Sequence, residues 1–389
     1  MTTLDDQRIA ELLQSAPVPE PRVDVARAVR DGRRRRRRRR LGGLTAVTVM
    51  AGVGAVGLVH LDDATSRTAP VAPAFAESPA GAASTAPPSS VTCEASWLPR
   101  PIAGPVAVAN SVDPSGRYVV GDIGTGQEDG RVVLWSDGQA AVLPAGARHA
   151  AAVNARGDVV GTSGDGTGWV YRNGKVRILA TPPGYHAVLV SAVNGRGDIA
   201  GTARAAGDVH RAVLWSADHP QEYRLVGPPG SAATGITDDG TVVGAMGELP
   251  YRWTPQGTGT TLELPDGHPR ASVQSARGDW AIGMVPGAQQ GGAVQMLPVR
   301  WNLTTGAVSL LPFPGVAGVA ATGDLLVGDG APLVVAPDGT SRRLPGRPDV
   351  RATEAGTYLA NGISDDGLTV VGAVSEKQAY RPLVWRCQR

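Results

Sequence analysis

The histidines are the first candidates for acid–base or metal chemistry in this sequence. There are six of them: His60, His149, His186, His210, His219 and His268. His149 and His186 each precede a short apolar segment of the same kind, which predicts that both rings face one end of a common channel. A metal site needs clustered ligands held in orientation by further hydrogen-bonded groups, and no carboxylates recur in matching positions. We therefore interpret the histidines as polar loop residues and predict no catalytic, cofactor-binding or metal-binding residue.

The tripeptide Arg-Gly-Asp is a second candidate, because it can be read as a cell-adhesion signal. It begins at Arg156, Arg196 and Arg277. Each of its glycines stands at the same place in a repeated phrase, where a turn with positive φ is expected. The Asp-Asp-Gly turns at Asp238 and Asp365 suggest calcium, but a single turn supplies too few oxygen ligands. We assign all of these residues to turns.

These candidates lie in a phrase that recurs along most of the chain. Its clearest copy runs from Ala192 to Gly201, as a short apolar strand, a turn, a second strand and a closing glycine. The closing glycines lie 39 to 45 residues apart, at Gly121, Gly161, Gly201, Gly244, Gly283, Gly328 and Gly372. A fixed period of this length is typical of a four-stranded propeller blade.

A second hairpin follows in each unit. Its first strand contains a tryptophan in six of the seven units, namely Trp135, Trp169, Trp215, Trp253, Trp301 and Trp385. A large aromatic side chain at one repeated position predicts core packing between blades. With Asp-Gly and Asn-Gly turns throughout, the sequence predicts an all-β fold, a seven-bladed β-propeller of four-stranded antiparallel blades over residues 93–389. A solenoid of the same strands would need capping units.

Two units depart from the repeated pattern. The fifth has Gln274 where other units have Asn, Thr, Ser or Asp, and the sixth has no tryptophan in its Leu333-Val334-Val335 strand. We expect either that these two blades are distorted or that the unit boundaries there are displaced by several residues.

The ends of the repeated region complement each other. The last unit supplies three strands and then stops, while Ala95-Ser96-Trp97 resembles a missing fourth strand. Antiparallel pairing of that segment beside the last strand puts Cys93 opposite Cys387, the only two cysteines of the protein. We predict a disulfide between them that locks the ring, against the alternative of two unrelated free thiols.

The amino-terminal part predicts a membrane anchor. Residues 1–40 are a short polar tail ending in the run Arg33 to Arg40, and residues 41–61 are an apolar stretch long enough to cross a bilayer as a transmembrane helix. The arginines place the tail in the cytoplasm and the remainder outside. Residues 62–92 are rich in Ala, Pro and Ser, which is typical of a spacer. A cleaved signal peptide is the alternative, with an Ala-x-Ala match at Ala74 lying well beyond the apolar stretch.

The overall charge excludes general nucleic-acid binding. The formal net charge is +2, but eight of the positive charges belong to the arginine run. The rest of the chain is therefore net negative, which does not suit a polyanionic partner.

Two families are similar to parts of this sequence. The phrase (Ala/Gly)-(Val/Ile)-(Asn/Thr/Ser) with a following Gly-x-Val-Val-Gly and Leu-Trp strand, as in Ala152 to Gly161 and Val213 to Trp215, resembles the extracellular repeats of the HAF family. That resemblance spans nearly all of residues 93–389 and implies an exported β-rich repeat without a known catalytic residue. The arrangement of residues 1–61 resembles membrane-bound anti-sigma factors of actinobacteria, although it has no Cys or His zinc ligands in the tail.

Three functions follow as hypotheses. The first is a single-pass membrane protein that displays a non-catalytic binding module for a protein, peptide or cell-wall glycan. The second is a transmembrane regulator whose tail contacts a cytoplasmic partner such as a sigma factor. The third is an exported hydrolase or lyase with a site at the channel mouth. Pull-down with residues 1–32 would separate the second hypothesis from the first, and a substrate screen would separate the third.

Overall fold

The computed structural model describes residues 91–125, 130–207, 209–290, 293–350, 357–376 and 379–389. All of them lie within one compact unit, Met50–Arg389. The tail and the span predicted for residues 1–61 fall outside the described residues, as does the spacer apart from its last two residues. Within the described ranges there is no helix long and apolar enough to cross a bilayer.

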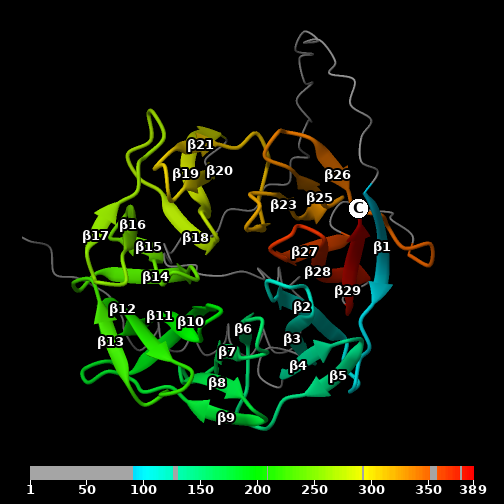
Figure 1. The fold of residues 1–389 in the computed structure, drawn as a ribbon, viewed down its shortest axis with the longest axis horizontal. Coiled ribbons are helices and arrows are strands. Elements are labelled where there is room, and N and C mark those ends of the chain that lie inside the picture. Colours follow the sequence, from blue (N-terminus) through cyan, green and yellow to red (C-terminus); the bar gives the residue numbers. More distant parts are fainter. Residues whose placement is uncertain (1–90, 126–129, 208, 291–292, 351–356, 377–378) are drawn as a thin grey trace, which may run out of the picture. The chain divides into compact units, whose positions relative to one another are not determined.

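Five four-stranded antiparallel sheets form separate blades of a β-propeller around a common centre (Figure 1). The first is β6 (Ala150–Val153), β7 (Val159–Thr162), β8 (Gly168–Arg172) and β9 (Lys175–Ile178). The second is β10 (Ala187–Val193), β11 (Asp198–Arg204), β12 (His210–Ser216) and β13 (Tyr223–Val226). The third is β14 (Ser231–Ile236), β15 (Val242–Met246), β16 (Leu249–Trp253) and β17 (Gly259–Thr261).

The next two blades contain the units that depart from the repeat. One is β18 (Ser272–Arg277), β19 (Trp280–Gln290), β20 (Ala293–Asn302) and β21 (Val308–Leu310). The other is β22 (Gly318–Val319), β23 (Leu325–Val327), β25 (Leu333–Val335) and β26 (Ser341–Arg343). The latter has strands of only two or three residues, and so it is the shortest blade.

The remaining strands form a single nine-stranded sheet, which contradicts the prediction of seven separate blades. It contains β24 (Asp329–Gly330), β27 (Tyr358–Ile363), β28 (Thr369–Glu376), β29 (Ala379–Gln388), β1 (Thr92–Trp97), β2 (Val106–Val112), β3 (Tyr118–Gly124), β4 (Arg131–Ser136) and β5 (Gln139–Val142). The described residues therefore form five separate blades and one larger sheet, with no helix among them. The all-β propeller prediction was right in class and wrong in blade count.

Two local pairings join strands that the repeat had assigned to different units. Val106 of β2 pairs in parallel with Tyr380 of β29, and β24 pairs with the start of β27 at Asp329–Leu359 and Gly330–Tyr358. Neither pairing belongs to the repeated phrase. A sequence repeat describes the strands within one unit, so it does not predict these contacts between units.

The meeting of the two ends of the described chain follows the predicted register. β1 lies antiparallel beside β29, with Cys93 opposite Cys387 and Trp97 opposite Leu383 (Figure 1). A disulfide joins Cys93 to Cys387, which are 294 residues apart in the chain. The amino-terminal strand is thereby attached to the carboxyl-terminal strand both by a ladder and covalently.

The hydrophobic core lies between neighbouring sheets. One cluster, for example, brings Val160 and Val170 of one blade against Val188, Ile199 and Trp215 of the next. The six repeated tryptophans are all buried, with at most 3% of their surface exposed, which confirms their predicted packing role. Burial of a large apolar side chain contributes about 1.5–3 kcal/mol, so this repeated position is a major source of stability.

The asparagine of the repeated phrase links neighbouring blades. Asn194 is buried; its Oδ1 accepts from the backbone N–H of Arg196 and of Asp198, and its Nδ2 donates to the carbonyl of Thr237 in the next blade at 3.1 Å. Asn154 donates in the same way to the carbonyl of Asn194 at 2.9 Å. A buried amide with all these partners both shapes its own turn and attaches it to the next sheet.

Candidate functional site

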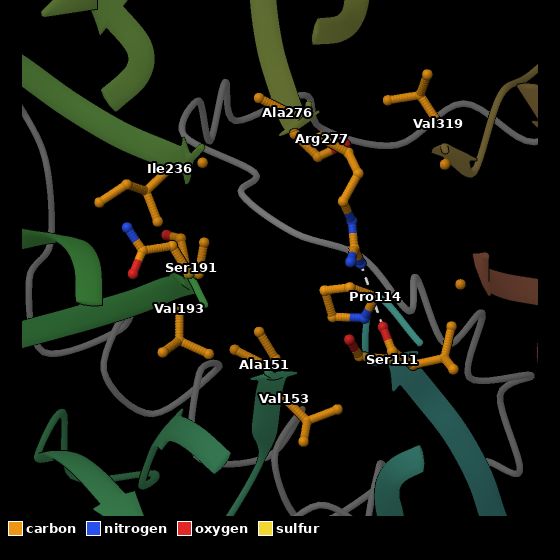
Figure 2. Close-up of a pocket in the computed structure, with 18 of the residues that line it drawn as sticks. Ser111, Pro114, Ala151, Val153, Ser191, Val193, Ile236, Ala276, Arg277 and Val319 are labelled. Carbon is orange, nitrogen blue, oxygen red and sulfur yellow. Dashed lines mark hydrogen bonds between the residues drawn. The ribbon is translucent and has the colours of Figure 1, made fainter. Parts of the chain in front are cut away.

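The central cavity is lined by the first strand of each repeat. It has a volume of about 130 Å³, and its lining contains no aromatic residue among the described ones. Small apolar residues such as Ala151, Val153 and Val193 alternate with polar ones around it (Figure 2). The cavity is therefore narrow, and its chemistry comes from a few polar side chains.

β-Bulges supply several of those polar side chains. The pairing between first and second strands shifts register around Asn110, Ala151, Ser191, Thr234, Gln274 and Asn361. The extra residue of a bulge is unpaired and turns its side chain out of the regular alternation. Five of these six residues, all except Gln274, line the cavity.

The polar bulge residues use some of their hydrogen bonds to attach other strands, of the same sheet or of the next one. Ser191 Oγ donates to the carbonyl of Ala233 at 3.0 Å, and Asn361 Nδ2 donates to the carbonyl of Ala109 at 2.9 Å. Thr234 Oγ1 donates to the carbonyl of Val243 at 3.4 Å. The hydroxyl oxygens keep acceptor capacity, and the Asn361 amide keeps one N–H and its oxygen. The wall can therefore both accept and donate without carrying a charge.

Arg277 is the one cationic side chain in the lining of the cavity, as far as the described residues go. It extends from β18 toward Ser111 and Pro114 on the other side (Figure 2). Its Nη2 donates to the carbonyl of Val112 at 3.2 Å, and its Nη1 lies 3.1 Å from Asp365 Oδ1. Asp365 Oδ1 forms no aligned hydrogen bond, so the contact between the two side chains is mainly Coulombic.

The turn after β18 explains why this arginine reaches the cavity. Arg277 pairs directly with Trp280, so only Gly278 and Asp279 form the turn. In the equivalent hairpin of the second blade, β10 ends at Val193 and the pairing resumes at Ile199. The third Arg-Gly-Asp therefore has its arginine inside a strand, whereas the other two have it in a turn.

The two other arginines of this tripeptide lie over glycines of the next blade. A Cβ at Gly197 would collide with the guanidinium of Arg156, and one at Gly240 would collide with that of Arg196. Gly197 and Gly240 also have φ of 86° and 90°, which disfavours any other residue. The prediction that these glycines are turn residues is confirmed, and their neighbours serve contacts between blades.

Three carboxylates lie near Arg277. Burial raises the pKa of Asp365, Arg277 lowers it, and the charges of Asp238 and Asp113 raise it again. Asp113 is buried and accepts from the backbone N–H of Ser115 and Tyr118 at 2.9 and 2.6 Å. Asp238 accepts from the backbone N–H of Gly195 at 2.7 Å. The two Asp-Asp-Gly turns, at Asp238 and Asp365, thus lie near each other, at the mouth of the cavity that the carboxyl ends of the lining strands form.

A second polar group lies toward the end of the cavity where the lining strands begin. Asp122 Oδ2 accepts from Asn110 Nδ2 at 2.7 Å, and Oδ1 lies 3.4 Å from the backbone nitrogen of Ala150. Burial raises the pKa of Asp122, opposed first by the charge of His149. The backbone of His149 has a φ of 50°, a left-handed conformation that is uncommon outside glycine. These contacts attach the nine-stranded sheet to the first blade.

The sequence-selected histidines do not come together as a site. His149 adjoins Asp122, while the exposed His186 lies elsewhere, with its backbone N–H donating to the carbonyl of Arg204 at 2.9 Å. Across the described ranges, no group of three or more His, Cys, Asp or Glu residues is placed to hold a metal ion. Of the residues that line the cavity, Arg277 and Asp238 were considered from the sequence but assigned to turns, and the polar bulge residues were not selected. Only the altered phrase around Gln274 signalled that the fifth repeat differs there.

Comparisons with known proteins show likeness in fold alone. No family model matches the chain, and no curated protein matches its sequence. Among solved structures, an oligogalacturonate lyase from Vibrio parahaemolyticus is similar, with a TM-score of 0.51 and 8% sequence identity over 76% of this chain and 96% of that one. A chain of a mitotic checkpoint complex matches with a TM-score of 0.46 and 14% identity over 86% of this chain and 99% of that one. The resemblance to HAF repeats stays a prediction, and the fold to which these residues belong is the β-propeller.

Proposed function

We propose that this protein is a non-catalytic binding module, anchored in a membrane by residues 41–61 and displaying its propeller outside the cell. The central cavity is its ligand site. The observation that carries the proposal is the uncharged polar wall formed by Ser191, Thr234 and Asn361, which line the cavity. The anchor follows from the apolar stretch and the arginine run. The disulfide between Cys93 and Cys387 suits an oxidising compartment.

The hydrogen bonds of the wall favour binding over catalysis. An activated serine or threonine donates to a nearby base such as histidine, whereas Ser191 and Thr234 donate to backbone carbonyls. The charged groups at the cavity end are likewise occupied, because Arg277 faces Asp365. These residues are built to hold a polar group in place.

Among protein, peptide and glycan ligands, the cavity suits the end of a glycan best. Sugar hydroxyls both donate and accept, as the wall does. A peptide side chain in a binding hot spot is usually aromatic or arginine. The lining of the cavity has no apolar pocket for an aromatic ring and little free carboxylate to bind an arginine. A volume of about 130 Å³ is below that of pockets that enclose whole drug-sized ligands. The cavity therefore receives a terminal group of a longer chain.

Calorimetric titration of the full chain in detergent micelles tests this proposal. The probes are short oligomers of N-acetylglucosamine and, in parallel, short peptides of similar length. We expect the oligosaccharides to bind, and Thr234→Val to weaken binding about three- to tenfold through loss of one hydrogen-bond acceptor. Thr261→Val, on the exposed strand β17, is the matched control and should have no effect.

Two results would reject the proposal. Binding of the peptides alone would reject the glycan ligand. Shortening of the oligosaccharides during the titration, followed by chromatography, would instead show an exported enzyme. If neither probe binds, the cavity is not a site for these ligands and the proposal fails.

A further inference from the structure

Arginines seal several of the junctions between neighbouring sheets. Arg300 Nη1 donates to the carbonyl of Gly323 at 3.3 Å, and Arg342 Nη2 donates to that of Gly367 at 2.7 Å. Arg386 Nη1 donates to the carbonyl of Gly116 at 3.3 Å, and Arg252 donates to that of Leu303. Arg300, Arg342 and Arg252 thus reach a turn or loop of the next sheet, whereas Arg386 reaches the β2–β3 turn within its own nine-stranded sheet.

The junction between the β10–β13 blade and the β14–β17 blade is different, because it contains an open groove. Leu214 pairs with Ala200 and precedes the buried Trp215. Arg252 and Arg300 hold the same position, directly before Trp253 and Trp301. With leucine in place of arginine, the junction keeps a groove of about 300 Å³.

Arg342 is the structural counterpart of Arg224 in another blade, and its guanidinium makes a contact that Arg224 lacks. Arg224 pairs with Leu214 across β12 and β13, as Arg342 pairs with Val334 across β25 and β26. Arg342 uses its guanidinium to bind the next sheet. Among the described residues Arg224 has neither a hydrogen bond nor an ion pair, although its side chain lines the groove.

The other groups of the groove define its chemistry. Leu214 and Ile236, which are 9% and 6% exposed, supply an apolar floor. Arg196 is already neutralised, since its Nε and Nη2 lie 3.1 and 3.0 Å from Asp198 Oδ2. Of the lining cations, Arg224 is thus the one without a counter-ion in the described part of the chain. The exposed Glu222 is the lining carboxylate that has no ion pair among the described residues.

We propose that this groove is a second ligand site, which binds a carboxylate carried on a small apolar body. A guanidinium forms two parallel hydrogen bonds with a carboxylate, and Arg224 is the group that makes them. The apolar body rests on Leu214 and Ile236, with the ring of Tyr223 beside it. Glu222 opposes the ligand charge, so it limits affinity and disfavours ligands with a second negative charge. This site is independent of the central cavity.

Benzoate and benzylammonium test the charge requirement, because they share an aromatic body and differ in the sign of their charge. Binding to the full chain in detergent micelles is followed by ligand-observed saturation-transfer NMR. We expect benzoate to bind and benzylammonium not to bind. Arg224→Gln should weaken benzoate binding about tenfold, and Glu222→Gln should strengthen it.

The neighbouring blade offers a matched control for Arg224. Arg177 occupies the same register position on β9, opposite Val170, and is also exposed. Arg177→Gln removes the same charge from an equivalent strand outside the groove, so it should leave benzoate binding unchanged. An equal loss in both variants would show a general charge effect and overturn the proposal.

A sealing variant tests the groove itself. Leu214→Arg places an arginine where the next two blades have Arg252 and Arg300, and we expect it to fill the groove and abolish benzoate binding. Its thermal unfolding should stay cooperative, which separates sealing from misfolding. If Leu214→Arg folds and still binds benzoate, or if benzylammonium binds the parent protein equally well, the proposal is wrong.

Discussion

Two ties connect parts of the propeller that are far apart in the chain, and they differ in kind. At the seam, β1 pairs with β29 and the Cys93–Cys387 disulfide joins them. Across the central cavity, Arg277 links β18 to Val112 and Asp365. The seam is a hydrogen-bonded ladder reinforced by a covalent bond, whereas the second tie is a polar contact beside a cavity. The first therefore determines whether the ring holds together, and the second determines the charge at the end of a site.

The largest effect should come from breaking the covalent part of the seam. In the chain-entropy model, a disulfide that closes a loop this long contributes up to about 5 kcal/mol. We expect the double variant Cys93→Ser, Cys387→Ser to lose much of this in the free energy of unfolding, measured by guanidinium titration. Reducing agent should lower the stability of the parent protein similarly and leave the variant unchanged. Equal midpoints for parent and variant would show that the ladder alone closes the ring.

Removing the tie across the cavity should cost less. Arg277→Gln leaves the half-buried Asp365 without its cation, and we expect a loss of about 1–2 kcal/mol at neutral pH. Arg196→Gln is the control, because it removes an arginine of the same tripeptide from a more exposed pair. That control should lose less than about 1 kcal/mol. Equal losses would mean that Arg277 acts as an ordinary surface residue.

The cost of Arg277→Gln should depend on pH. Burial raises the pKa of Asp365 and Arg277 lowers it, so the variant should have a still higher pKa at this carboxyl. A protonated Asp365 needs no counter-ion. The loss of stability caused by Arg277→Gln should therefore be largest at neutral pH, and it should decrease as the pH falls through the pKa of Asp365. Carboxyl NMR titration and thermal unfolding across the same pH range measure both effects, and a pH-independent difference would contradict the pairing.

The smallest effect should come from the side chains that cover the seam. Arg381 lies over the ring of Trp97, with Cζ 3.8 Å from the ring centre. Trp97 Nε1 also donates to Asp349 at 2.9 Å. We expect Arg381→Gln to cost about 0.5–1 kcal/mol, detected most clearly in the cysteine-free background. The exposed Arg343→Gln is the control, and a larger loss there would exclude a specific role for the Trp97 contact.

Several features could be predicted because they are local and repeated. The six repeated tryptophans, the turn glycines such as Gly197, and the opposition of Cys93 and Cys387 all follow from strand periodicity and turn chemistry. Each depends on residues close in the chain, or on the rule that a ring of sheets brings its two ends together.

The candidate sites were harder to predict because they arise where the repeat fails. Arg277 has the same tripeptide as Arg196, and only the shorter turn after β18 turns it into the cavity. The groove at Leu214 exists because leucine stands where the next two repeats have Arg252 and Arg300. Such differences acquire meaning only when the strands are aligned in space.

By itself, the sequence determined the all-β class, the repeated hairpins, their buried tryptophans and the strand that pairs at the end. Period-two alternation and glycine turns depend on the backbone over a few residues, so they can be read along the chain. Tertiary structure alone decided that β24, β27 and β2 extend one nine-stranded sheet, and that Arg277 faces Asp365 across the cavity. These are contacts between units, and their formation depends on how far apart the sheets stand after they pack.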